Sequence, residues 1–230
     1  MKVLVVDLGL GNLGSVLQAL HRAGAKPQLS NDPDAVAAAG RVILPGVAAF
    51  GLGMERAARF KPALQAALAR QAPVLGICLG MQILFEEGDE DGTRSGLGLL
   101  PGRVTRLPDT VQVPHIGWQE LRATAPSPLL PGPPGWVYFA HSYRCAAPPE
   151  VTQAVAEHGA ERIAAVVGRG TLYGVQFHPE KSAEAGEALL RALLQNERVG
   201  REKWIVMNNA RNALGIQRKQ CADLQKPSTR

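Results

Sequence analysis

The fold is indicated most clearly by residues 73–80, which read PVLGICLG. The apolar run 73–77 predicts a strand buried on both faces, as in a parallel sheet, and residues 79–86 have the pattern of a helix. Cys78 stands between them in the arrangement glycine-x-cysteine-x-glycine, where the two glycines relieve crowding in a sharp turn. We therefore predict that a strand delivers Cys78 to the carboxyl end of a sheet, at the first turn of a helix.

The sequence before this segment alternates between strand and helix patterns. Apolar runs predict strands at 2–6, 27–29 and 41–44, and helical spacing recurs in 12–22, 53–59 and 62–70. Such alternation is typical of the α/β class with a doubly wound, mostly parallel central sheet flanked by helices.

The second half of the chain has a different character. From 102 to 167, Pro, Gly and β-branched residues separate short apolar runs, which predicts antiparallel strands added to the main sheet. A further strand is expected at 171–177 and a closing helix at 183–194. A Pro-rich stretch, 125–135, is expected to form a surface loop.

A cysteine nucleophile needs a base, and one candidate lies a hundred residues beyond Cys78. Residues 177–180 read FHPE and close the strand at 171–177. Residues two apart in an extended segment project to the same side, so Glu180 can orient the imidazole of His178 and stabilise its charged form. A helix N-terminus favours the thiolate form of Cys78. The alternatives are a buried structural cysteine and a strand-end histidine without a role.

A third element follows the strand at 41–44. Residues 44–47 read LPGV, and a Pro-Gly turn there can direct backbone N–H groups towards the active edge of the sheet. Together with the N–H of Leu79, such a turn would form an oxyanion hole. From the residues alone, however, it is only a turn.

Three segments together resemble the class I (triad) glutamine amidotransferase family. They are PGVAAFG at 45–51, GICLGMQ at 76–82 and QFHPEKS at 176–182. Within the family the chain is most similar to the glutaminase subunits of imidazole glycerol phosphate synthase, through DLGLGNL at 7–13, PHIGW at 114–118 and FAHSY at 139–143. The resemblance extends from about residue 2 to residue 194.

The resemblance implies a role for each residue of a catalytic triad. Cys78 would attack the carboxamide of L-glutamine, His178 would carry the proton to the departing ammonia, and Glu180 would orient His178. Water would then hydrolyse the glutamyl thioester to glutamate. No cofactor and no metal are expected, and no group of residues has metal-ligand spacing.

The resemblance also implies the residues around the triad. The oxyanion hole would be formed by Gly46, Val47 and Leu79, and the amino-acid end of glutamine would be bound by Gln82, Ser142 and Tyr143. One departure concerns Ala48, because family members commonly have glycine there, in a turn whose backbone is expected to reorient during catalysis. Alanine tolerates a positive φ less well than glycine does.

The expected partner is a separate cyclase subunit of the (β/α)₈-barrel type, which would form a heterodimer with this chain and use the ammonia in histidine biosynthesis. Lys181 and Trp118 are expected at the contact surface, although Trp118 could equally be a packed core aromatic. A chain of 230 residues has no room for a synthase domain of its own.

Four other functions stay open at this point. The chain could be the glutaminase subunit of another amidotransferase, a stand-alone γ-glutamyl hydrolase, or a pseudoenzyme that serves as a binding module. A remote alternative is a dinucleotide-binding protein, because GLGNLG at 9–14 fits the G-x-G-x-x-G pattern and Asp32 lies at a suitable spacing to hold a ribose.

Charge and composition limit the remaining possibilities. The net charge of +5 resides in residues 201–230, with seven basic and two acidic groups, so the first 200 residues are neutral and offer weak support for nucleic-acid binding. We expect one glutamine amidotransferase domain at 1–200 and a tail at 201–230 that is disordered or non-native. No apolar run is long enough for a membrane span or has the form of a signal peptide, so a cytoplasmic location is expected.

Overall fold

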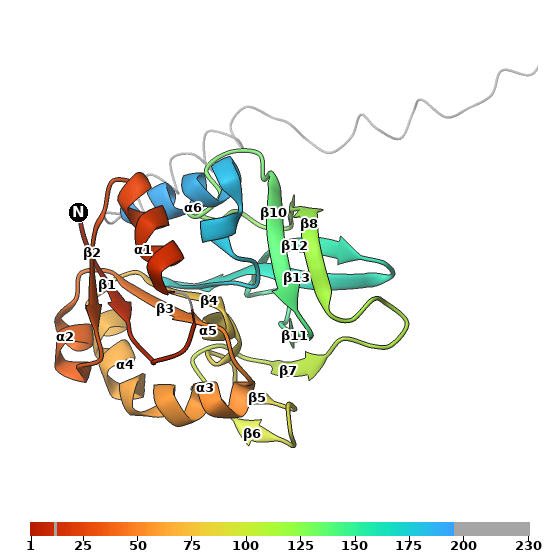
Figure 1. Cartoon of the computed structure of the whole chain (residues 1–230), viewed down its shortest axis with the longest axis horizontal. Coiled ribbons are helices and arrows are strands. Elements are labelled where there is room, and N and C mark those ends of the chain that lie inside the picture. The colour runs from red at the N-terminus through yellow and green to blue at the C-terminus, as the bar shows by residue number, and fades with distance from the viewer. Residues whose placement is uncertain (12, 196–230) are drawn as a thin grey trace, which may run out of the picture. The chain divides into compact units, whose positions relative to one another are not determined.

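The computed structural model describes residues 1–11 and 13–195, and the tail expected at 201–230 lies outside the described residues. Its centre is an eight-stranded sheet in the order β2-β1-β3-β4-β14-β13-β12-β9 (Figure 1). The strands are β1 Lys2–Val6, β2 Lys26–Ser30, β3 Val42–Gly46, β4 Val74–Cys78, β9 Arg122–Ala123, β12 Thr152–His158, β13 Glu161–Arg169 and β14 Leu172–Val175.

The direction of pairing changes once across this sheet. The five strands from β2 to β14 are parallel to their neighbours, whereas β13, β12 and β9 are added in antiparallel pairs. Both β3 and β4 are buried along their whole length, as expected for strands covered on both faces. The predicted α/β fold, with a mostly parallel sheet and added antiparallel strands, is therefore confirmed.

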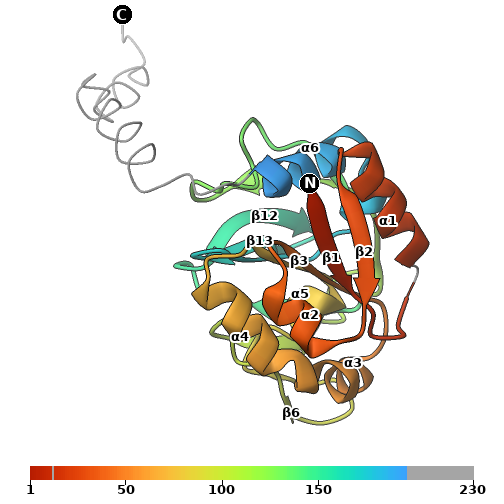
Figure 2. The same cartoon turned by 90° about the vertical axis from the view of Figure 1, so that its left-hand side faces the viewer.

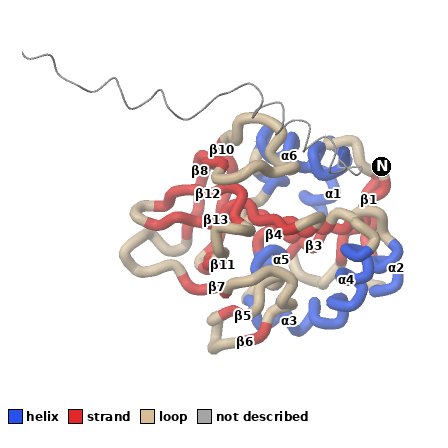
Figure 3. Tube along the Cα trace, turned by 180° about the vertical axis from the view of Figure 1, so that it is seen from behind, coloured by secondary structure: helices blue, strands red, loops and turns tan. Residues whose placement is uncertain are grey.

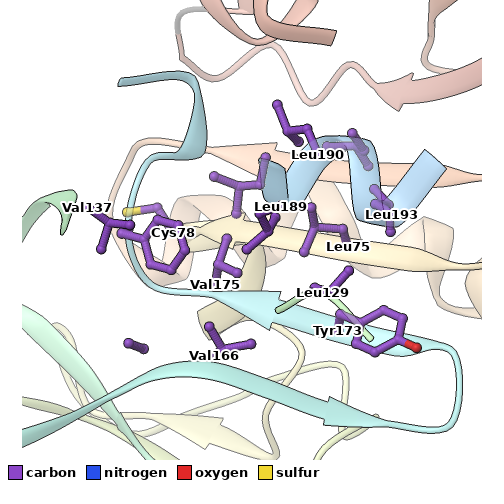
Figure 4. Packing of buried hydrophobic residues seen from close by; sticks show 14 of the residues in the cluster. Leu75, Cys78, Leu129, Val137, Val166, Tyr173, Val175, Leu189, Leu190 and Leu193 are labelled. Atoms are coloured by element: carbon purple, nitrogen blue, oxygen red, sulfur yellow. The ribbon is translucent and has the colours of Figure 1, made fainter. Parts of the chain in front are cut away.

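Helices cover both faces of the parallel part (Figures 1 and 2). One face carries α1 Leu13–Arg22 and α6 Ala183–Gln195, with the short 3₁₀ turn η2 Pro179–Lys181 packed against both. The other face carries α2 Pro33–Ala38, α3 Phe50–Ala57, α4 Lys61–Ala69 and α5 Leu79–Gln82, with the short 3₁₀ turn η1 Ala58–Phe60. Each face has its own apolar core. In Figure 4, Leu189, Leu190 and Leu193 of α6 pack over the sheet, with Cys78 at the end of its strand. None of the helices in the described ranges could cross a membrane.

Two smaller sheets complete the described part of the chain. One is a ribbon of β8 His115–Glu120 and β10 Trp136–His141, and Figure 3 shows it beside the β12–β13 end of the main sheet. The other contains β5 Glu87–Gly88, β6 Arg94–Ser95, β7 Arg103–Arg106 and β11 Tyr143–Ala146. Along the ribbon, buried and more exposed side chains alternate, so one face packs inward and the other faces solvent.

The helix expected at 79–86 is shorter than predicted. It ends at Gln82, because the backbone carbonyls of the next three residues accept hydrogen bonds from a returning segment. Leu97 N donates to Ile83 O at 2.8 Å, and Gly98 N donates to Phe85 O at 2.9 Å. These long-range bonds replace the bonds that would have continued the helix.

Candidate active site

The backbone at Cys78 has the strained form expected of a presented nucleophile. Cys78 joins β4 to α5 with φ 54° and ψ −112°, a conformation that non-glycine residues rarely adopt. The turn is tight enough to exclude side chains on both sides. A Cβ on Gly76 would lie 2.4 Å from the carbonyl oxygen of Gly80, and a Cβ on Gly80 would lie 1.7 Å from that of Leu44. The two glycines are therefore required by close backbone approach.

His178 and Glu180 lie together just beyond the end of β14. His178 Nδ1 is 2.8 Å from Glu180 Oε1, and both side chains are almost wholly buried. An ionised carboxylate can only accept a hydrogen bond, so Nδ1 carries a proton and donates it. This arrangement leaves Nε2 of His178 for the proton of Cys78.

The charge state of His178 is set by these two neighbours. Burial by itself lowers the pKa of His178, but the hydrogen bonds and charges of Cys78 and Glu180 outweigh burial and raise the pKa to about 9. His178 is therefore protonated at neutral pH and can donate a hydrogen bond to the sulfur of Cys78.

The candidate oxyanion hole lies next to the nucleophile. Gly46, the last residue of β3, stands opposite Cys78 in the parallel ladder, and Leu79 is the first residue of α5. Val47 follows Gly46 and is about half exposed. Ala48 does not have a positive φ, so the turn as it stands accommodates alanine without backbone strain.

Gln82 and Tyr143 are in direct contact. Gln82 is buried, and its Nε2 donates to the carbonyl oxygen of Tyr143 at 3.0 Å and to Gln176 Oε1 at 3.3 Å. Ser142 precedes Tyr143 and is partly buried, and its carbonyl accepts from Leu107 N. The three residues expected at the amino-acid end of glutamine are thus held in one region.

Two residues of this region were missed by sequence reasoning. Glu90 Oε2 accepts from Phe50 N at 2.6 Å, at the start of α3. Burial raises the pKa of Tyr143, and the negative charge of Glu90 adds to the shift. Glu90 lies in an acidic stretch without motif spacing, so no local signal identified it. Gln176 stands two residues before His178 in the motif QFHPEKS, and that spacing could have identified it.

The dinucleotide-binding alternative finds little support in this geometry. Beside Gly11, a cavity of about 110 Å³ extends to Pro45, His178 and Glu180, which is far smaller than typical cofactor pockets. The carboxylate of Asp32 accepts from Asp34 N at 3.0 Å and caps α2. Within the described ranges, no group of three or more His, Cys, Asp or Glu residues could hold a metal ion.

Comparison with known proteins identifies the family. A model of the glutamine amidotransferase class-I family matches residues 4–196. The chain belongs to this family. Membership makes it a glutamine amidotransferase, for which a cysteine nucleophile is typical, and favours the triad over the dinucleotide-binding alternative.

Several curated relatives carry the same name, imidazole glycerol phosphate synthase subunit HisH. The relative from Symbiobacterium thermophilum is 49% identical over 194 residues, which cover 82% of this chain and 91% of the relative. The relative from Halobacterium salinarum is 48% identical over 198 residues, covering 82% and 90%. The relative from Bacillus licheniformis is 46% identical over 201 residues, covering 83% and 94%.

Solved structures support the fold at lower identity. PurLQS from Thermotoga maritima superposes with a TM-score of 0.66 at 22% identity, covering 84% of this chain and 97% of the other. The glutaminase domain of CTPS from Trypanosoma brucei superposes with a TM-score of 0.59 at 15% identity, covering 85% and 94%.

Proposed function

We propose that this chain is the glutaminase subunit of imidazole glycerol phosphate synthase, and that it hydrolyses L-glutamine and passes the ammonia to a cyclase subunit. The observation that carries the proposal is the buried His178–Glu180 pair beside Cys78 on its strained turn. The near full-length similarity to subunits of that synthase supports the choice of acceptor.

The chemistry begins at the sulfur of Cys78. The thiolate attacks the carboxamide carbon of glutamine, and the carbonyl π electrons move to oxygen. This oxygen accepts hydrogen bonds from the backbone N–H groups of Leu79 and of residues 46–47 at the end of β3. His178 then transfers its proton to the nitrogen, the C–N bond breaks, and ammonia departs. A glutamyl thioester remains on Cys78.

Water completes the cycle. His178, now neutral, takes a proton from the attacking water, and the second tetrahedral intermediate releases glutamate and the Cys78 thiolate. Glu180 keeps the imidazole in the orientation and tautomer that both steps need.

The contacts of Gln82 limit what it can do for the substrate. Both hydrogens of its amide already have acceptors, namely Tyr143 O and Gln176 Oε1. Its Oε1 can only accept, so we expect it to face the α-ammonium of glutamine rather than the α-carboxylate. Ser142 and Tyr143 remain the candidates for the rest of the amino-acid end.

The solvent-facing side of the β8–β10 ribbon is the candidate docking face for the cyclase. Ile116, Trp118 and Trp136 on this face are 59%, 46% and 57% exposed, so the alternative of Trp118 as a core aromatic is wrong. Trp118 meets the ring of Tyr138 edge to face at 6.0 Å, and Lys181 Nζ lies 5.6 Å from the same ring. A cluster of exposed aromatics with a cation is typical of residues that anchor protein interfaces.

The same ribbon is bonded to the catalytic histidine. His178 N donates to the carbonyl oxygen of Tyr138 at 2.9 Å, and Tyr138 N donates to Ser182 Oγ at 3.0 Å. A partner bound to Trp118 and Tyr138 would therefore contact the strand whose backbone is hydrogen-bonded to His178. This contact supports dependence of the glutaminase on its partner.

Glutamate release from glutamine tests the proposal. Wild type and Cys78→Ser are compared with and without the matching cyclase subunit, which we take to be of the (β/α)₈-barrel type, and Cys221→Ser, outside the described residues, serves as control. We expect low activity alone, a strong rise with the cyclase, and loss of both in Cys78→Ser only.

Other outcomes identify the competing functions. Activity that depends on Cys78 but ignores the cyclase would indicate another amidotransferase or a γ-glutamyl hydrolase. Inactivity in every combination, with cyclase binding intact, would indicate a pseudoenzyme.

A further inference from the structure

Gln176 is a buried polar side chain that the mechanism above leaves without a task. It follows directly after β14, and no part of it is exposed to solvent. The last ladder pair between β14 and β4 is Val175 with Ile77, so the next residues along the two chains are Gln176 and Cys78. Gln176 and His178 both lie in the bend that follows β14, and both side chains reach the sulfur of Cys78.

The contacts of Gln176 connect three buried polar groups. Its Nε2 lies 3.9 Å from Cys78 Sγ. Its Oε1 lies 3.3 Å from Gln82 Nε2 and 3.9 Å from Cys145 Sγ. Burial raises the pKa of the Cys145 thiol, so Cys145 stays protonated and acts as a donor.

The orientation of the Gln176 amide follows from a fixed point in the backbone. The carbonyl oxygen of Tyr143 can only accept, so Gln82 must direct its NH₂ group there, at 3.0 Å. The second hydrogen of that NH₂ points at Gln176, which must present its oxygen. The NH₂ of Gln176 is then left to face Cys78. An amide assigned in this way does not depend on a choice between two equivalent flips.

We infer that Gln176 is a further residue of the catalytic site, an amide donor that holds the Cys78 sulfur as a thiolate. The inference deepens the proposed function, because it rests on the role of Cys78 as nucleophile. The positive charge of His178 is lost when His178 transfers its proton, whereas the amide N–H of Gln176 can donate throughout the reaction. It therefore favours the thiolate both before attack and when the thioester releases sulfur.

The test measures the reactivity of the Cys78 sulfur directly and needs no glutamine. Full-length wild type, Gln176→Glu and Gln176→Met are treated with iodoacetamide from pH 5 to 10, and alkylation of Cys78 is followed by peptide mass spectrometry. Glutamate at 176 keeps an acceptor for Gln82 but replaces the donor by an oxygen that becomes charged, whereas methionine removes the donor without adding charge. Gln28→Glu, the same change at an exposed position on β2, is the control.

We expect the pH of half-maximal alkylation to increase in the order wild type, Gln176→Met, Gln176→Glu, with a total change of about 1 pH unit. In the complex with the cyclase, kcat for glutamine should fall about 10-fold or more in both variants, while KM changes less than about 3-fold. Gln28→Glu should match wild type in both assays.

Two results would overturn the inference. One is an alkylation profile unchanged in both variants, with melting temperatures showing that they are folded. The other is a purely KM-based defect, which would make Gln176 a substrate-binding residue. Alkylation does not require turnover. If the proposed glutaminase activity is absent, the glutamate assay will show it, and the alkylation test can still be interpreted.

Discussion

At the scale of single residues, several residues of the site are individually unfavourable for folding, and the rest of the fold must offset their free-energy cost. Cys78 has a positive φ, Gly80 has no room for a side chain, and His178 and Glu180 are nearly buried as a charged pair. Removing only one partner of a buried charged pair strongly destabilises the fold, so neither residue can be replaced independently of the other. The catalytic arrangement and the local strain thus involve the same few positions.

Glu180→Gln should move the alkaline limit of activity. Glu180 helps to raise the pKa of His178 to about 9, and the reaction needs this proton for the departing ammonia. Glutamine at 180 keeps an acceptor but removes the charge, so His178 should lose its proton at lower pH. We expect the descending limb of kcat/KM, measured by glutamate release with the cyclase, to move down from about 9 by about 1 unit. Glu184→Gln, exposed on α6, should leave it in place.

Gly80→Ala should prevent the turn from forming. An added Cβ would lie 1.7 Å from the carbonyl oxygen of Leu44, and backbone on both sides leaves neither group free to move. We expect a loss of about 3 kcal/mol or more in the free energy of unfolding, measured by urea denaturation. Gly40→Ala, which meets nothing within 4 Å, should stay within about 1 kcal/mol of wild type. Equal stability of the two variants would show that the turn relaxes.

The proposed triad could be predicted from the sequence because its signals are local. Cys78 lies between two glycines at a strand end, and His178 and Glu180 are two residues apart. The bonds of Gln176 were not accessible, because its partner Gln82 is 94 residues away and the contact exists only in the folded chain. Expectations for individual side chains at the substrate end came from family resemblance, since no spacing rule identifies them.

At the scale of elements, local periodicity predicts where strands and helices lie, but it does not predict which segments pair with one another or where that pairing ends a helix. The strand from 73 to 77 and the helix from 183 to 194 lie within about one residue of β4 and α6. The helix expected at 79–86 ends early because Ile83 and Phe85 bond to a segment that returns from 97. The ribbon of β8 and β10 separates from the main sheet, which local patterns of alternating residues cannot show.

His115 and His141, on the inner face of that ribbon, should make the fold sensitive to acid. Burial is the main cause that lowers their pKa values, to about 3 and about 4, and His115 Nδ1 lies 3.0 Å from His141 Nε2. Because their pKa values are lowered in the folded state, the unfolded chain binds more protons than the folded chain below about pH 6.5. The folded state therefore has its full stability above about pH 6.5 and loses stability as the pH falls towards 4.

His115→Phe should reduce this sensitivity. The ring of His115 already stacks on Phe139 at 4.8 Å, so a phenyl ring suits the site. Between pH 7.5 and pH 5, wild type should lose about 2 kcal/mol more in the free energy of unfolding than the variant does. Urea denaturation at the two pH values measures the difference, and His21→Asn, exposed on α1, should behave as wild type. Parallel losses in all three proteins would contradict the assignment.

At the scale of the whole molecule, the proposed function predicts that glutamine is hydrolysed mainly when the cyclase is bound. The ribbon connects the two functions, because its outer face carries the exposed Trp118 and its Tyr138 carbonyl accepts a hydrogen bond from His178 N. A cyclase that docked on this face could use part of its binding energy to orient His178. Such coupling would not be needed in a stand-alone hydrolase.

Trp118→Ala separates these cases. Removal of an exposed aromatic anchor should weaken binding of the cyclase about 10-fold or more, measured by titration calorimetry, with little effect on folding. At saturating cyclase the stimulated rate should also fall, because the contact with Tyr138 is lost even when the partner is bound. Leu52→Ala, exposed on α3, should change neither quantity. Weakened binding with a full stimulated rate would make the face an anchor alone, and the signal to His178 would then have to enter elsewhere, with Lys181 as the nearest remaining contact.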